Sequence, residues 1–124
     1  MTIAEAISHV DKLKPNGYPD SMKIGWLSNL DGQVFKEIFQ THADSPIDSF
    51  EGYENVSPDT ELLIPYPYCE DIYNYFLQKN IDKENGETAK YNQSVMLYNN
   101  AFLAFQNYYN RTHMPIGKGT RFIF

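Results

Sequence analysis

The stretch from Tyr91 to Tyr109 constrains the fold of this chain more than any other part of the sequence. Its large apolar residues recur in alternating steps of four and three, which places them on one stripe of an α-helix. The stripe consists of Tyr91, Val95, Tyr98, Phe102, Phe105 and Tyr109, and it is widened by Leu97, Ala101, Ala104 and Tyr108. A helix that is apolar over most of its circumference is usually covered on several sides. The pattern therefore predicts the central helix of a small bundle.

The size and composition of the chain predict a single soluble domain over residues 1–124. A chain of 124 residues has room for one hydrophobic core, and 42% hydrophobic residues favour a globular rather than a disordered chain. No apolar run approaches the roughly 20 residues that cross a bilayer, and the N-terminus does not resemble a signal peptide. We therefore expect a protein made in the cytoplasm, with no membrane association. The single Cys69 agrees with that compartment.

The first two helices are predicted from their ends. Thr2 and Glu5 have the spacing of a capping box at the start of a helix over residues 2–13. A second helix is expected over about residues 20–40, with Asp20 or Ser21 as its N-cap. Asp31-Gly32 interrupts its apolar face, and glycine there costs about 1 kcal/mol against alanine. We therefore expect a kink or a close packing contact at that point.

Residues 41–67 lack helical periodicity and are rich in turn-forming residues, so they predict a long central loop. Within it, residues 60–64 read as a short strand, and residues 50–53 could pair with it as a β-hairpin. A connection of this length in a small domain is usually functional or partly disordered. The loop is therefore the best candidate for an arm that contacts another molecule.

The second half of the chain predicts a helical hairpin followed by a tail. A third helix is expected over about residues 68–83 and is closed by Gly86. Only a few residues then precede the helix that contains Tyr91, so the two helices should be antiparallel. Residues 113–124 predict an extended C-terminal tail with an apolar end. The fold class is mainly α: a bundle of about four helices with a long loop and a tail.

The sequence contains no constellation that predicts an enzyme, a metal site or a cofactor site. His9, His42 and His113 are far apart in the sequence, and Cys69 lies among aromatic residues, where inert packing is expected. The acidic clusters are expected to be solvated carboxylates rather than catalytic pairs. Residues 117–120 resemble a phosphate-binding loop only superficially, because the first glycine and the final Ser or Thr are missing.

The charge balance argues against a dedicated nucleic-acid-binding protein. The net charge is −6, whereas DNA binding depends on clustered Lys and Arg that neutralise phosphates. An acidic balance is still compatible with a protein that DNA must pass without adhering. Ten tyrosines suit surfaces that are half buried or shared with a partner, because the ring packs while the hydroxyl stays hydrogen-bonded.

Four segments, in this order over nearly the whole chain, resemble a family of small head–tail connector proteins of long-tailed bacteriophages and prophages. These segments are Ile24-Gly25-Trp26-Leu27-Ser28-Asn29-Leu30-Asp31-Gly32, Glu61-Leu62-Leu63-Ile64-Pro65-Tyr66-Pro67-Tyr68, Asn85-Gly86-Glu87 with Tyr91-Asn92, and Tyr108-Tyr109-Asn110-Arg111-Thr112-His113-Met114-Pro115. The family is also called head-completion or adaptor proteins. No single segment is specific by itself, so the resemblance depends on their combination.

The resemblance implies a helical subunit that assembles into a ring of about twelve copies at the neck of the virion. There it would bind the portal protein on one side and a tail-side neck protein on the other, and it would extend the channel through which DNA passes. It implies no catalytic residue and no cofactor. The isolated subunit could be a monomer that assembles only on its portal.

The interaction residues expected for such a ring lie on the second helix, in the loop and at the C-terminus: Trp26, Phe50, Tyr53, Tyr109, Arg111, Arg121, Phe122 and Phe124. Two other classes of function stay open at this point. A Tyr-rich bundle could enclose a small ligand or act as a regulator, and the loop carboxylates could serve an enzyme. Another phage role, in tail completion or tail assembly, is also compatible with the sequence.

Overall fold

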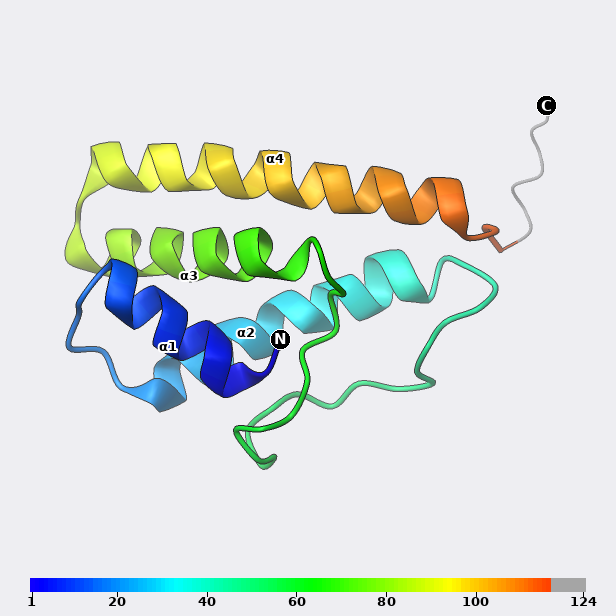
Figure 1. Ribbon diagram of the computed structural model, residues 1–124, viewed down its shortest axis with the longest axis horizontal. Helices are drawn as coiled ribbons and strands as arrows, with labels where there is room; N and C mark the ends of the chain where they lie inside the picture. The colour runs from blue at the N-terminus through cyan, green and yellow to red at the C-terminus, as the bar shows by residue number, and fades with distance from the viewer. Residues whose placement is uncertain (117–124) are drawn as a thin grey trace.

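The computed structural model describes residues 1–116, which form four α-helices and one π-helical turn (Figure 1). These elements are α1 (Ile3–Leu13), α2 (Asp20–Val34), the π-helix η1 (Phe35–Phe39), α3 (Cys69–Asn85) and α4 (Thr88–Thr112). The predicted helical bundle with a long central loop is confirmed. The predicted tail falls largely in residues 117–124, outside the described residues. No helix in residues 1–116 is long and apolar enough to cross a membrane.

The helix ends follow the local signals in the sequence. Thr2 Oγ1 accepts a hydrogen bond of 3.1 Å from the Glu5 amide, and the Glu5 carboxylate accepts one of 2.8 Å from the Thr2 amide. The predicted capping box is therefore confirmed. Gly86 ends α3 with φ of +73°, a left-handed conformation that favours glycine. The N-cap of α2 is Pro19 rather than Asp20 or Ser21, an error of one or two residues.

The central helix of the bundle is α3, and the prediction that α4 occupies the centre is wrong. Helix α3 packs against α1, α2 and α4, and its apolar stripe is fully buried. Helix α4 lies antiparallel to α3 on the outside of the bundle (Figure 1). Of its large apolar residues, only Phe105 and Tyr109 are buried. Periodicity identified the helix, but the number of its neighbours depends on where α1 and α2 pack.

The predicted β-hairpin does not form. In residues 1–116 the only strand-like pairings are two isolated antiparallel bridges, Thr2 with Glu61 and His42 with Pro115. The backbone of the expected strand pairs instead with the N-terminal segment, since the Leu62 amide donates to the Met1 carbonyl at 2.9 Å. The amides of Leu62, Leu63 and Ile64 therefore find acceptors without a second strand.

The Asp31-Gly32 interruption is a packing contact rather than a kink. A Cβ placed on Gly32 would lie 3.8 Å from the Phe50 ring, so the loop packs directly against this turn of α2. Helix α2 continues past Gly32 to Val34 and then passes into η1. The close approach of Phe50 brings the middle of the long loop onto the body of the subunit.

Candidate interaction site

The outer face of α4 is an exposed surface without charge. Between Tyr91 and Asn110 the helix contains no Asp, Glu, Lys or Arg, although these residues make up 21% of the chain. Along this face Met96 is 58% exposed and Leu103 is 53% exposed. The other exposed residues are Asn92, Gln93, Leu97, Asn99, Asn100, Ala104, Asn107 and Asn110. We call this set the α4 outer face.

The composition of the α4 outer face is unusual for a surface that only meets water. Solvated helix faces normally carry charged side chains, whereas the centres of protein–protein interfaces are depleted of charge and enriched in Met and aromatic residues. Met96, Asn100, Leu103 and Asn107 recur in steps of four, three and four, so they form one continuous stripe. From Met96 to Asn107 the stripe runs about 17 Å along α4, at about 1.5 Å per residue.

The long loop is fastened to the helices by Asp31, which is fully buried on α2. Its carboxylate accepts hydrogen bonds from the Tyr53 hydroxyl, from the Tyr73 hydroxyl at 2.6 Å and from the Leu63 amide at 3.0 Å. The Tyr73 hydroxyl in turn accepts a hydrogen bond of 2.9 Å from the Ile64 amide. One carboxylate thus joins two parts of the loop to α2 and α3.

Burial dominates the electrostatics of this network. Burial raises the pKa of Asp31 to about 6, although the hydrogen bonds from Tyr53, Tyr73 and Leu63 act in the opposite direction. Burial and the neighbouring Asp31 carboxylate also raise the pKa of Tyr53 and Tyr73. Asp31 therefore carries its charge at neutral pH, where it accepts three hydrogen bonds and both phenols stay protonated.

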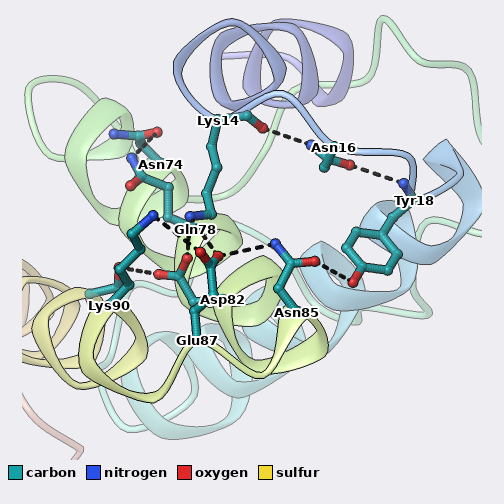
Figure 2. Close-up of polar contacts among 10 residues, drawn as sticks. Lys14, Asn16, Tyr18, Asn74, Gln78, Asp82, Asn85, Glu87 and Lys90 are labelled. Carbon is teal, nitrogen blue, oxygen red and sulfur yellow. Dashed lines mark hydrogen bonds and ion pairs between the residues drawn. The ribbon is translucent and has the colours of Figure 1, made fainter.

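A second polar cluster ties the end of α1 to the turn between α3 and α4 (Figure 2). Lys14 Nζ lies 2.5 Å from Asp82 Oδ1 and 3.1 Å from Glu87 Oε1, and Ser94 donates a hydrogen bond of 2.8 Å to Asp82. The Asp82 side chain is 2% exposed, so Lys14 compensates a buried charge. Hydrogen bonding to Asp82 raises the pKa of Lys14. Bonds from Lys90, Asn85 and Lys14 lower the pKa of Glu87 to about 2.

An aromatic cluster fixes the C-terminal end of α4. The Tyr109 ring stacks on the His113 ring, with centroids 3.8 Å apart and planes 3° from parallel. The rings of Phe39 and His42 also pack on Tyr109, at 5.4 Å and 4.8 Å. His42 Nδ1 lies 2.7 Å from the Ile38 carbonyl, so this nitrogen carries a proton. The rings of Phe39 and His42 therefore hold the C-terminal end of α4 against the loop side of the molecule.

An open cleft of about 360 Å³ adjoins this cluster. It is lined by Phe39, Asp44, Pro46, Leu63, Pro65, Tyr108, Tyr109 and His113, and we call it the aromatic cleft. Asp44 is the only lining residue with a formal negative charge. Tyr109 is 4% exposed, and its hydroxyl finds no hydrogen-bond partner within residues 1–116. Burial is the larger cause that raises the pKa of Tyr109, and the nearby Asp44 carboxylate is the smaller one.

The predicted interaction residues differ in how far they are buried and in what they contact. Trp26 is half-buried on α2 and packs edge-on against Tyr18, with centroids 6.4 Å apart. Phe50 is half-buried against Tyr53, which is buried with its hydroxyl on Asp31. The structure therefore brings Phe50 and Tyr53 together but leaves Tyr53 inaccessible to a partner.

At the C-terminal end of the described chain, the predicted residues also differ in exposure. Tyr109 is buried in the aromatic cluster, whereas Arg111 is exposed in the last turn of α4. A cation at that position faces the negative end of the helix dipole. Arg121, Phe122 and Phe124 lie outside the described residues.

Two features of the site were not predicted from the sequence, although each has a signal in it. An acid on an apolar helix face, as Asp31 is, must find buried hydrogen-bond donors, but the sequence did not say which tyrosines supply them. Tyr109 and His113 are four residues apart, a spacing that places their side chains together on a helix. In the part of the chain that the structure describes, no group of three or more His, Cys, Asp or Glu residues could hold a metal ion.

Comparison of the chain with protein-family models, with curated proteins and with solved structures finds no match. Its function is therefore inferred from the arrangement of its own residues and from the resemblance described above.

Proposed function

We propose that this chain is a structural subunit of the neck of a long-tailed bacteriophage, where copies form a ring between the portal and the tail. The observation that carries this proposal is the α4 outer face, a long exposed surface without charge on a chain of net charge −6. Such a face is stabilised when a partner covers it. The order of the four segments that resemble head–tail connectors supports the same role.

A closed ring requires two different contact surfaces on each subunit, because head-to-tail contacts are heterologous. Helices α4 and α1 lie on opposite sides of α3 (Figure 1). The outer side of α1 is an exposed face formed by Ala4, Glu5, Ser8, His9, Lys12 and Leu13, and Leu13 at its end is 58% exposed. We assign the α4 outer face to one side of the ring contact and this α1 face to the other.

The charge of the chain suits a channel for DNA. A wall of net negative charge repels phosphates, so DNA can move through without adhering. The anchored loop is also suited to assembly, because Asp31 and the two tyrosines fix its conformation before a partner binds. Less conformational entropy is then lost on assembly.

The experiment is electron microscopy of particles from the phage that encodes this chain, with the gene deleted and then restored. We expect DNA-filled or leaking heads beside free, complete tails in the deletion strain, and intact virions after complementation. Normal, infectious, tailed particles in the deletion strain would overturn the proposal. A small-ligand-binding or regulatory bundle, or a role in tail assembly, would then have to be tested in its place.

A further inference from the structure

The aromatic cleft is an incomplete site within residues 1–116. Its walls are aromatic rings, two prolines and a leucine, and its one acidic residue is Asp44. The Tyr109 hydroxyl at its wall is buried without a hydrogen-bond partner among the described residues. The lining therefore suits an occupant that is apolar and carries a cation.

The described chain ends in a short pairing with the start of the long loop, next to this cleft. The Ala43 amide donates to the Met114 carbonyl at 2.8 Å, and the Ile116 amide donates to the Thr41 carbonyl at 3.0 Å. Residues 114–116 therefore run antiparallel to residues 41–43, toward Thr41. Of the residues that line the cleft, Asp44, Pro46 and His113 lie at the start of this pairing, and Phe39 lies beyond Thr41. Ile116 is therefore only a few residues from the cleft lining.

The residues that follow have the composition that the cleft requires. Gly117-Lys118-Gly119-Thr120 is followed by one cation, Arg121, and by three apolar residues, Phe122, Ile123 and Phe124. Eight residues can span up to about 28 Å at about 3.5 Å per residue. We propose that residues Arg121–Phe124 of one copy occupy the aromatic cleft of the neighbouring copy in the ring, an inference that rests on the proposed function.

Each part of the cleft has a counterpart in this segment. The Arg121 guanidinium can pair with Asp44 and stack on the exposed side of the aromatic rings. The phenylalanine side chains fit the apolar wall formed by Phe39, Pro46 and Pro65. Every subunit then gives one segment and receives one, which is how heterologous contacts close a ring.

The test is disulfide trapping in assembled particles, with the full-length chain carrying both Pro46→Cys and Phe122→Cys. Pro46 is exposed, and the native Cys69 is fully buried and does not compete. We expect oxidised particles to give a ladder of covalent multimers on a non-reducing gel, which collapses to monomer on reduction. The matched control pairs Phe122→Cys with Val56→Cys, an exposed loop position that does not line the cleft. It should give no ladder.

The outcomes separate this inference from the proposed function. If the unsubstituted chain is absent from purified particles, the neck role fails and the inference fails with it. If the chain is present but the double variant stays monomeric, or closes an intrachain disulfide, the neck role stands and the exchange between copies is overturned.

A charge exchange gives a second readout that does not depend on cysteine chemistry. Asp44→Arg and Arg121→Asp should each lower the yield of infectious particles at least about tenfold, because each places like charges together. The two substitutions combined should restore most of the yield. Single variants that assemble like the unsubstituted chain would overturn the inference.

Discussion

The Tyr73 hydroxyl on α3 donates a hydrogen bond of 2.6 Å to Asp31 on α2. It also accepts one of 2.9 Å from the Ile64 amide in the long loop. A single phenol thus connects the central helix, a neighbouring helix and the loop. Within residues 1–116 the loop makes two isolated β-bridges, and this hydrogen-bond network and the burial of Tyr53, Leu62 and Ile64 also hold it in place.

Removal of the Tyr73 hydroxyl should destabilise the fold more than removal of the Tyr53 hydroxyl. Tyr73→Phe leaves the buried Ile64 amide without an acceptor and Asp31 without one donor, which should cost about 2–3 kcal/mol. Tyr53→Phe removes one donor only and should cost about 1–2 kcal/mol. Urea denaturation measures both, with Tyr75→Phe on the same helix as the control. Equal losses for the three variants would contradict the network.

The raised pKa of Asp31 predicts a pH-dependent stability. With the pKa raised from 3.8 to about 6, the folded state binds the proton more tightly than the unfolded chain. The contribution of this group is therefore complete below about pH 4 and is lost as the pH rises through 6. The free energy of unfolding should fall by about 1.4 kcal/mol between pH 5 and pH 7.5.

Asp31→Asn provides the control for this pH dependence. The amide does not titrate, so the fall between pH 5 and pH 7.5 should disappear, on top of a general loss of stability. The lowered pKa of Glu87, about 2, acts only below pH 4.5 and does not interfere in this range. An unchanged slope in Asp31→Asn would show that another group is responsible.

Lys14 and Lys90 both pair with Glu87 but should differ in their effect on stability. Lys14→Met leaves Asp82 buried without its cation and should cost about 3 kcal/mol. Lys90 is 63% exposed, so Lys90→Met should cost less than about 1 kcal/mol. Thermal or urea unfolding of the two variants measures the difference. Similar losses would mean that the Asp82 charge is compensated by other groups.

Gly52 should not tolerate alanine, whereas Gly17 should. Gly52 has φ of +94°, and an added Cβ would lie 2.8 Å from Ser28 Oγ, which accepts a hydrogen bond from the Tyr53 amide. Gly52→Ala should therefore cost about 1–3 kcal/mol. At Gly17 nothing lies within 4 Å of the added Cβ, and the change should be close to neutral. Equilibrium unfolding of both variants tests this contrast.

Charges placed on the α4 outer face should block assembly without unfolding the subunit. Met96→Glu and Leu103→Glu introduce carboxylates at exposed positions, so circular dichroism and the urea midpoint should change little. Complementation of the deletion strain should fail, because a carboxylate buried in an interface is strongly unfavourable. Val56→Glu, at an exposed loop position, is the matched control and should complement normally.

The helical elements were determined largely by local sequence. The capping box at Thr2 and the left-handed Gly86 act within a few residues, and the period of α4 is visible without any neighbour. These interactions are between residues close in the chain, so the sequence predicts the helices and the antiparallel pairing of α3 with α4. The absence of helical period in residues 41–67 likewise identified the long loop.

The positions of these elements were decided by contacts between residues far apart in the chain. Whether α3 or α4 is central depends on where α1 and α2 bury their apolar faces. The apolar period of a single helix does not show which other helices pack against it. Tyr53 resembled an exposed loop residue, yet its hydroxyl completes the hydrogen bonds of Asp31, 22 residues away in the sequence. A buried carboxylate needs donors from any part of the chain that can reach it, so only the tertiary structure shows which tyrosines are buried and which surface remains for a partner.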